Sequence, residues 1–377
     1  MSNYSRDFAS FDGKIWLNVA SEGPIPNVAA HALETAMEWK CKPFLLTNPK
    51  FLNIPLQLKQ SLAQLIHVNA EDIILGNSAS YGLHLLANGL PLMAGDEVIT
   101  MQNDFPVNIL PWLGLSKKGV IVHQIAAKDW TVSVDEVADA ITAKTKVVCL
   151  SLIHSFSGHK IDTVRIGEIC RQKKIIFILN YSQALGAFPV DVSSIWIDAI
   201  VCAGYKWLLG GYGTGFCWMT PELRRSLEYN QAYWYSVLEP AAINSPNALE
   251  LPNVNSARKF DVFATSNFFN FVPWLASIDY LNGVGLENIA RHNRALVDQF
   301  VDGLDPLKYF LISPKEKGKR TNIVVFSHKD KARNESIFES LKNQGVFLAL
   351  WKGNLRVSPH LYNSSQDIVS LLKLLHE

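Results

Sequence analysis

Seven short apolar runs, rich in β-branched residues, recur between Glu71 and Met219. They are EDIIL at 71–75, EVIT at 97–100, GVIVHQI at 119–125, KVVCLSLI at 146–153, KIIFIL at 174–179, DAIVCA at 198–203 and TGFCWM at 214–219. Between many of them lie helical-length segments whose apolar residues are spaced three and four apart. Strands that are nearly continuously apolar and alternate with helices indicate a mostly parallel sheet that is covered on both faces. We therefore predict an α/β fold with a mostly parallel seven-stranded sheet between helices.

Two of these helical segments begin at residues that commonly cap helices. SVDEVADAI starts at Ser133 and DTVRIGEICRQK starts at Asp162, and both side chains can accept a hydrogen bond from the first turn.

The pattern changes from about Arg258 onward. A longer helical region covers residues 271–304, and strand-like NIVVF and GVFLAL and a C-terminal helical segment, SQDIVSLLKLLH, follow it. We expect a smaller α+β domain here. The predicted division is a large α/β domain at 15–250 and a small domain made of 1–14 and 251–377.

The composition of the 377-residue chain allows a large buried core, because 48% of residues are hydrophobic and 18% are charged. The formal net charge is +1, which gives no electrostatic basis for binding nucleic acid or an anionic membrane. No apolar run approaches the roughly 20 residues of a membrane span.

The five cysteines are scattered and odd in number. No CxxC pair or Cys/His cluster is present, so the sequence supports neither a disulfide framework nor a metal site. The N-terminal MSNYSRDFASFDGK lacks the charged and apolar blocks of a signal peptide, and we expect a cytoplasmic protein.

Small, polar and aromatic residues follow the predicted strands, where ligands of such sheets bind. They are Ser78 and Ser80, Phe105, the segment HSFSG at 154–158, Asn180 and Gln183, and Tyr205 and Lys206. Together they offer a helix start for a phosphate, an aromatic face, polar groups and a lysine. A pyridoxal phosphate (PLP) site needs this set.

Lys206 has the neighbours of a reactive lysine. It lies between Tyr205 and Trp207 in AIVCAGYKWLLGGYGTGF, after an apolar run and before four glycines. A lysine in a partly desolvated pocket loses its proton more easily and becomes a nucleophile near neutral pH.

Six motifs, in order, resemble the class V aminotransferase family of fold type I PLP enzymes, which includes cysteine desulfurases, kynureninase and isopenicillin N epimerase-like proteins. The six motifs are IWLNVASEGPIP, DFPVNILPW, NYSQALGAFPVDV, AGYKWLLGGYGTGF, FDVFATSN and LRVSPHLYNSSQDI. The resemblance covers nearly the whole chain. It implies an enzyme that acts on an amino acid as a transferase, epimerase or lyase.

The resemblance assigns the cofactor to Lys206 through an internal Schiff base, with the freed amine acting as the general base at Cα. Ser78, Ala79 and Ser80 would bind the phosphate, the middle one through its backbone N–H. Phe105 would stack on the pyridine ring, where many members use histidine.

Further roles follow from the same resemblance. Ser155 and Gln183 would lie near the phenolic oxygen of the cofactor, and Tyr205 replaces a histidine that binds the phosphate. Thr265 would reach the phosphate of the partner subunit, which implies a homodimer with shared active sites. Arg356 would hold the α-carboxylate of the substrate through a bidentate pair.

Two departures from the family pattern bear on the chemistry. Cysteine desulfurases carry a catalytic cysteine shortly before the carboxylate-binding arginine, whereas NQGVFLALWKGNLRVSPH contains none. Persulfide transfer is therefore not expected. Asn180 stands where the family has an aspartate that keeps the ring nitrogen protonated, so the ring would be a weaker electron sink.

Three interpretations remain open at this stage. The protein is an active PLP enzyme, or a PLP-binding protein whose catalysis is attenuated or lost because of Asn180, or a protein that binds another phosphate ligand with the same set of residues.

Overall fold

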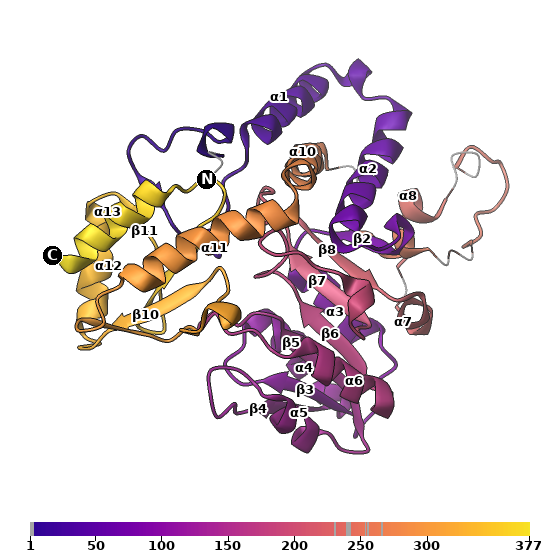
Figure 1. Ribbon diagram of the computed structural model, residues 1–377. Coiled ribbons are helices and arrows are strands. Elements are labelled where there is room, and N and C mark those ends of the chain that lie inside the picture. Colours follow the sequence, from indigo (N-terminus) through magenta and orange to yellow (C-terminus); the bar gives the residue numbers. More distant parts are fainter. Residues whose placement is uncertain (1–3, 230, 239–242, 253, 255, 265–266) are drawn as a thin grey trace.

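The computed structural model describes residues 4–229, 231–238, 243–252, 254, 256–264 and 267–377 (Figure 1). Its main feature is a seven-stranded sheet of order β2-β8-β7-β6-β5-β3-β4. The strands are β2 (Ile73–Gly76), β3 (Glu97–Met101), β4 (Ile121–Ile125), β5 (Thr145–Ser151), β6 (Ile176–Asn180), β7 (Ala199–Ala203) and β8 (Gly215–Met219). Only β8 pairs antiparallel with its two neighbours, β2 and β7. Each strand overlaps one of the seven predicted apolar runs, so the mostly parallel seven-stranded sheet is confirmed.

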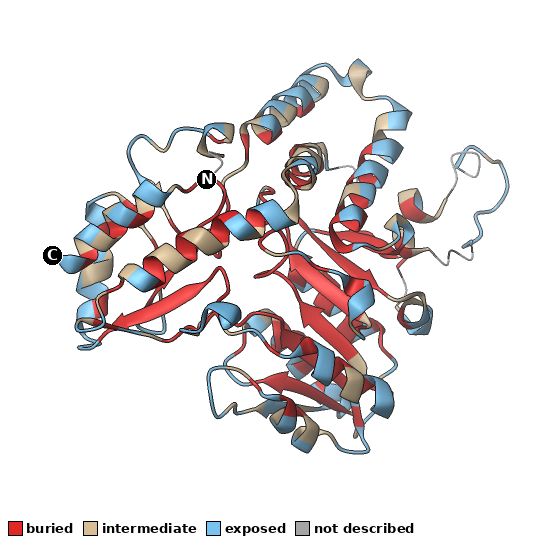
Figure 2. Ribbon diagram, in the orientation of Figure 1, coloured by how far each residue is buried: buried red, intermediate tan, exposed pale blue. Residues whose placement is uncertain are grey.

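Helices cover both faces of this sheet. The helices of the described chain are α1 (Asn27–Cys41), α2 (Asn48–Ile66), α3 (Ala79–Gly89), α4 (Leu110–Leu113), α5 (Val134–Ala140), α6 (Thr163–Lys173), α7 (Pro221–Ser226), α8 (Trp234–Val237), α10 (Phe268–Val284), α11 (Leu286–Gly303), α12 (Arg333–Asn343) and α13 (Ser365–His376). Figure 2 shows most strands of the large sheet as buried, with exposed residues mainly on the outer sides of the helices, whereas the edge strand β4 is exposed or half-buried along its length.

The two faces of the sheet bury alternate residues of the central strands. In β5, Val148 and Leu150 join one core with helices α2, α5, α6 and α10, whereas Val147 and Cys149 join another with α3 and α4. Successive side chains of a strand point to opposite faces, so a strand buried on both faces must be apolar throughout. This requirement explains why the central strands appear as continuous apolar runs in the sequence.

The predicted helix starts have the expected caps. The Ser133 hydroxyl accepts a hydrogen bond from the Glu136 backbone N–H at 3.2 Å, and the Glu136 carboxylate accepts one from the Ser133 backbone N–H in return. The Asp162 carboxylate accepts from the Arg165 backbone N–H at 3.1 Å. Each contact satisfies a free N–H group in the first turn of a helix.

The long helical region after Arg258 is divided into α10 and α11 at Gly285. This glycine has φ +84°, a conformation that other residues rarely adopt, and its N–H still bonds the Leu281 carbonyl. Helix α10 packs against α1 and α2, while α11 packs against α13 in the C-terminal part.

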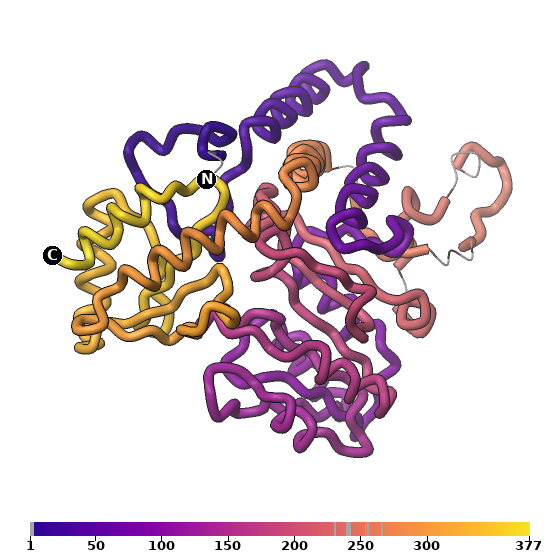
Figure 3. The backbone as a smooth tube through the Cα atoms, viewed as in Figure 1, coloured from indigo at the N-terminus to yellow at the C-terminus, as the bar shows by residue number. Residues whose placement is uncertain are grey.

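The C-terminal part contains an antiparallel sheet of order β12-β13-β10-β9. Its strands are β9 (Tyr309–Leu311), β10 (Val324–His328), β12 (Ala349–Trp351) and β13 (Asn354–Val357). Strand β1 (Ile15–Trp16) pairs in parallel with β11 (Val346–Phe347), and the C-terminus lies in this part of the molecule (Figure 3). The boundaries of the two domains stay a prediction.

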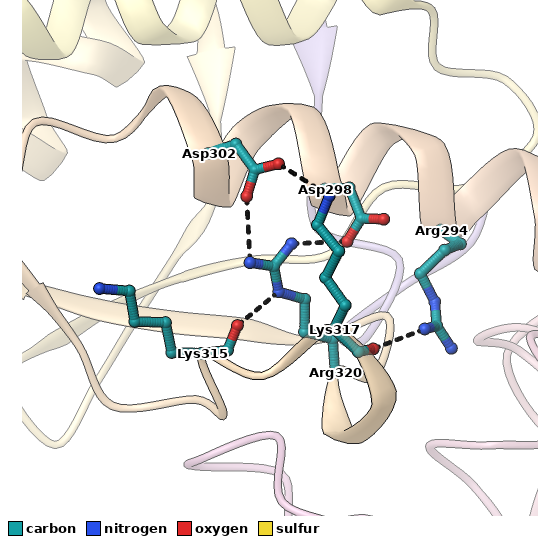
Figure 4. Close-up of polar contacts among 6 residues, drawn as sticks. All are labelled: Arg294, Asp298, Asp302, Lys315, Lys317 and Arg320. Atoms are coloured by element: carbon teal, nitrogen blue, oxygen red, sulfur yellow. Dashed lines mark hydrogen bonds and ion pairs between the residues drawn. The ribbon is translucent and has the colours of Figure 1, made fainter.

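Arg320 ties the segment before β10 to helix α11 (Figure 4). Its guanidinium donates to Asp298 at 2.6 Å and to Asp302 at 3.0 Å, and its Nε donates to the Lys315 carbonyl. The Arg320 side chain is only 6% exposed, whereas Asp298 and Asp302 are 25% and 51% exposed, so solvent reaches both pairs from the carboxylate side.

Candidate active site

The predicted ligand-binding residues meet at one edge of the large sheet, where the parallel strands end. A small cavity there is lined by Ser78, Ala79, Ser80, Phe105, Val107, Ser151, Ser155, Asn180, Ser182, Gln183, Ala203, Tyr205 and Lys206. Nine of the eleven residues predicted for the site are in this set. Of the other two, Arg356 lies next to Ser155, and Thr265 lies outside the described residues.

Lys206 follows the end of β7 and is buried, with 7% of its surface exposed. Burial, together with the positive charge of Arg356, lowers the pKa of its ammonium to about 8. Its Nζ lies 5.2 Å from the centre of the Phe105 ring and 5.8 Å from that of the Tyr205 ring. The aromatic neighbours replace water around the amine, so a substantial neutral fraction exists near neutral pH.

The backbone of Gly23 packs directly against the lysine loop. Its N–H donates to the Tyr205 carbonyl at 2.9 Å, and a Cβ at this position would lie 2.2 Å from the Lys206 carbonyl oxygen. Only glycine permits this approach, which gives a structural reason for the glycine in GPIP.

Helix α3 begins at the cavity. Ser78 is its N-cap, and the Ser78 hydroxyl accepts from the Tyr81 backbone N–H at 3.2 Å. Gly215, at the start of β8, packs against the Ser78 backbone, because a Cβ there would lie 2.6 Å from the Ser78 carbonyl carbon. The N–H groups of the first helical turn, including that of Ala79, therefore lie at the cavity and can bind an anionic oxygen.

Aromatic rings form one wall of the site. The Phe105 ring stacks on Phe156, with centroids 6.2 Å apart and an interplanar angle of 25°. The Tyr205 ring packs against Tyr212, with centroids 4.9 Å apart. Burial raises the pKa of the Tyr205 hydroxyl, so this group is a neutral hydrogen-bond donor.

Gln183 is held in one orientation by its neighbours. Trp207 Nε1 donates to its Oε1 at 2.9 Å, so its amide nitrogen must point the other way, where it donates to the Ala20 carbonyl and to Ser155 Oγ. The amide N–H groups of Gln183 and the hydroxyl of Ser155 are thus adjacent at the cavity.

Asn180 ends β6, and both ends of its amide are bonded. Its Nδ2 donates to Asn108 Oδ1 at 2.9 Å, and its Oδ1 accepts from the Ser182 backbone N–H at 2.9 Å. The side chain is 5% exposed. It therefore presents one remaining N–H and one remaining lone pair of the oxygen.

Arg356 lies on β13 and is 3% exposed. Its Nη1 donates to the Ser155 carbonyl at 3.1 Å, and its Nη2 donates to Asn18 Oδ1 and Ser21 Oγ. Its Nε is buried and has no hydrogen-bond partner in the described chain. Burial lowers the pKa of this guanidinium to about 10, far enough above neutral that the group stays charged.

Several residues at the site were not predicted from the sequence. Asn18 and Ser21 contact Arg356 and belong to LNVASEGPIP, a motif whose members have no predicted role. Asp104 and Asn108 lie behind Asn180. The sequence feature that could have indicated Asp104 and Asn108 is the DFPVN stretch, because it places a polar residue on each side of Phe105.

The segment before Arg356 is a tight hairpin. Strands β12 and β13 are joined by Lys352 and Gly353, whose φ values are +51° and +73°, as in the two-residue turns that best fit twisted hairpins. Lys352 Nζ lies 4.3 Å above the Phe156 ring. This hairpin contains no cysteine, and among the five cysteines only Cys41 is exposed.

The residues present fit PLP. Lys206 and Arg356 are buried cations, and in the described chain no carboxylate oxygen lies within 4.0 Å of either of them; Glu22 raises the pKa of Lys206 only from a longer distance. Buried cations without a paired carboxylate favour anionic ligands. The phosphate and the carboxylate of an amino acid supply such anions, and the unpartnered Nε of Arg356 offers a further donor.

The described residues support neither a metal site nor a membrane-spanning helix. No group of three or more His, Cys, Asp or Glu side chains could hold a metal ion in this part of the chain. Among the described helices, none has the length and apolar character that a bilayer crossing requires.

Known proteins resemble the chain in sequence and in fold. A probable cysteine desulfurase of Methanothermobacter thermautotrophicus is 26% identical over 401 aligned positions, which cover 99% of this chain and 96% of the relative. An uncharacterized aminotransferase of Schizosaccharomyces pombe is 24% identical, and the alignment covers 94% of this chain and 89% of the relative.

Two solved structures share the fold. A mutant of C-DES with glycine covalently linked to its PLP cofactor aligns with a TM-score of 0.88 at 18% identity, over 99% of this chain and 98% of that one. The apo cysteine desulfurase of Thermococcus onnurineus aligns with a TM-score of 0.85 at 19% identity, over 99% and 96% of the two chains. The predicted fold type I architecture is confirmed.

The family model for aminotransferase class-V matches residues 49–369. This match covers most of the chain, and it confirms both the predicted family and the predicted cofactor. The chain therefore belongs to the class-V aminotransferase family and is a PLP-dependent enzyme.

Proposed function

We propose that the protein acts on an amino acid through PLP held on Lys206, as a transferase, epimerase or lyase. The observation that carries this proposal is the burial of Lys206 beside a second buried cation, Arg356, at the end of β7. An active PLP site needs a lysine that loses its proton readily and an arginine that binds the substrate carboxylate, and we assign these two roles to Lys206 and Arg356.

The placement of the side chains around the cavity supports a set of proposed cofactor contacts. Ser78, Ala79 and Ser80 would hold the phosphate at the start of α3, with help from Tyr205. Phe105 would face the pyridine ring. The remaining contacts of the ring would come from Ser155, Asn180 and Gln183, all of which line the same cavity.

When bound, PLP supplies an electron sink that weakens the bonds at the Cα of an amino acid. The chain's own residues provide the rest. Arg356 would bind and orient the α-carboxylate with two parallel N–H donors. Lys206, neutral in a substantial fraction of molecules, would take the proton from Cα and return it. The half-buried rings of Phe105 and Phe156 would shield one side of this transfer from water.

The substrate side chain has an aromatic surface available to it. Trp351 lies 6.0 Å from the Arg356 guanidinium, and its ring packs on Phe156 at 5.8 Å. A substrate held by Arg356 would run its side chain along these rings, which favours a bulky or apolar amino acid.

Attenuated catalysis is the second candidate function, and Asn180 favours it. A neutral amide with both ends already bonded to Asn108 and Ser182 stabilises a protonated ring nitrogen less than a carboxylate does. Persulfide transfer is not proposed, although relatives are named cysteine desulfurases, because the hairpin before Arg356 has no cysteine.

The assembly and compartment are part of the same proposal. FDVFATSN resembles the family segment that reaches a partner subunit, so we place the enzyme in a homodimer with shared sites.

All five cysteines are free thiols, which is the usual state in a reducing cytoplasm. Fractionation of the cells that make the protein tests the compartment.

The function is tested by locating the cofactor. Borohydride reduction of the cofactor-loaded protein, followed by peptide mass mapping, should find the pyridoxyl group on Lys206, since this is the buried amine of the cavity. Lys352, at the hairpin tip, is the internal control and should stay unlabelled. A label on any other lysine would rule out the assigned role.

The rate at which the cofactor-free protein takes up PLP should rise with pH and level off above about pH 8. Only the neutral amine of Lys206 can attack the aldehyde, and a pKa of about 8 leaves about one molecule in ten neutral at pH 7. Stopped-flow absorbance across pH 6 to 10 measures the profile. A rate that keeps rising toward the pKa of an ordinary lysine would contradict the perturbed amine.

Replacing Arg356 by alanine should weaken amino acid binding by about 2–3 kcal/mol, the scale for losing hydrogen bonds to a charged group, while the cofactor stays bound. Arg356→Lys keeps the charge but loses the paired donors, so it should recover only part of the affinity. Spectral titration with amino acids gives both values. Unchanged affinity in Arg356→Ala would exclude the role.

The purified protein should sediment as a dimer, because the proposed site uses a residue of the partner subunit. Analytical ultracentrifugation with cofactor absorbance as the signal measures mass and occupancy together. A monomer that carries a full complement of cofactor would refute the shared site.

A further inference from the structure

A buried carboxylate, Asp104, lies directly behind the cavity. It is 3% exposed and precedes Phe105 in the loop after β3. Its Oδ1 accepts from the Phe105 backbone N–H at 2.7 Å and from the Ser151 hydroxyl at 2.7 Å. Its Oδ2 accepts from the Ser151 backbone N–H at 3.0 Å and from Asn108 Nδ2 at 2.9 Å. Four donors and no acceptor surround the group, as expected for an ionised carboxylate.

No cation neutralises this carboxylate at close range. In the described chain, no Lys, Arg or His nitrogen lies within 4.0 Å of Asp104. Lys352 and His154 feel its charge from farther away. A buried charge without a paired ion is costly, and its effect on neighbouring dipoles is strong because little solvent screens it.

Asp104 fixes the orientation of the Asn108 amide. A carboxylate only accepts hydrogen bonds, so the amide end that faces it must be the nitrogen. The second N–H of that nitrogen donates to Ser151 Oγ at 2.7 Å. Both N–H groups of Asn108 are thus used, and its Oδ1 must point toward Asn180.

The same constraint passes to Asn180. Because Asn108 presents an oxygen, Asn180 must present its nitrogen, and the bond between them is 2.9 Å. Asn180 Oδ1 then faces the Ser182 backbone N–H. A chain of three aligned groups leads from the carboxylate to the cavity, and aligned hydrogen bonds polarise one another. The negative charge of Asp104 therefore increases the electron density on Asn180 Oδ1.

We infer that Asp104 is a positioning residue that acts on the cofactor ring nitrogen through Asn108 and Asn180. This inference rests on the proposed placement of the ring beside Asn180. Asp104 supplies, from two hydrogen bonds away, part of the negative charge that an aspartate at position 180 would supply directly. The arrangement gives a ring nitrogen that is more protonated than a lone asparagine would make it, and less protonated than a carboxylate would.

A purely structural role for Asp104 makes a different prediction. The same carboxylate ties the loop at Phe105 to the end of β5 through two backbone N–H groups, so its loss would loosen the loop. Moving the carboxylate from position 104 to position 108 would not restore that tie. It would, however, place a negative charge one hydrogen bond from Asn180.

The decisive measurement is the ¹⁵N NMR shift of ring-labelled PLP bound to each variant, because this shift reports the protonation of the ring nitrogen directly. In Asp104→Asn the resonance should move toward that of unprotonated pyridine. In the double variant Asp104→Asn/Asn108→Asp it should return to or pass the natural position. Asn180→Asp marks the fully protonated end of the scale, and Asp129→Asn, which removes an exposed aspartate outside this network, should leave the shift unchanged.

The outcomes separate this inference from the proposed function. An unchanged ¹⁵N shift in Asp104→Asn, with cofactor still on Lys206, overturns the inference alone, and so does a double variant that fails to restore the shift. If Asp104→Asn does not fold, Asn108→Leu decides, since it breaks the relay but keeps the backbone contacts of Asp104; an unmoved resonance there also overturns the inference. A natural protein that holds no PLP on Lys206 would remove the proposed function, and the inference with it.

Discussion

The backbone of residues 17–23 holds the two halves of the active site together. Leu17 and Asn18 pair with Ser358 after β13, which carries Arg356, whereas the Gly23 N–H bonds the Tyr205 carbonyl beside Lys206. Between them, the Ala20 carbonyl receives the amide of Gln183. This one short segment, which turns at residues 19–21, therefore connects the strand that carries Arg356 with the loop that carries Lys206. A shift of this segment would change the substrate-binding and cofactor-binding sides of the site together.

The sequence predicts the large sheet and the residues that meet at its edge well, for a physical reason. Strands buried on both faces must be apolar throughout, and the positions at or just after their ends, such as Asn180 and Lys206, are then located to within a few residues. Helix caps such as Ser133 and Asp162 are equally local signals. The short strands β1 and β9 carry no such pattern, because two or three residues are too few to show a period.

The contacts of the site are less predictable, because they depend on residues far apart in the chain. Arg356 bonds Asn18 and Ser21 across 338 and 335 positions. The orientation of Asn180 depends on Asp104, which lies in a loop without periodicity. Comparison of the sequence with the family pattern shows that Asn180 stands where the family has an aspartate. It does not show that a carboxylate lies two hydrogen bonds behind it, since that requires the loop after β3 to fold against the end of β5.

The two-residue turn at Lys352 and Gly353 limits what the enzyme can do with its product. A side chain that carries an atom from an active site to an acceptor protein needs a long, freely moving tether. Here the connection between β12 and β13 is as short as a hairpin allows, and the Lys352 ammonium reaches back to the Asn103 side chain at 3.3 Å and over the Phe156 ring. The described hairpin therefore has neither a cysteine nor a long tether that could carry an atom from the cavity to an acceptor protein.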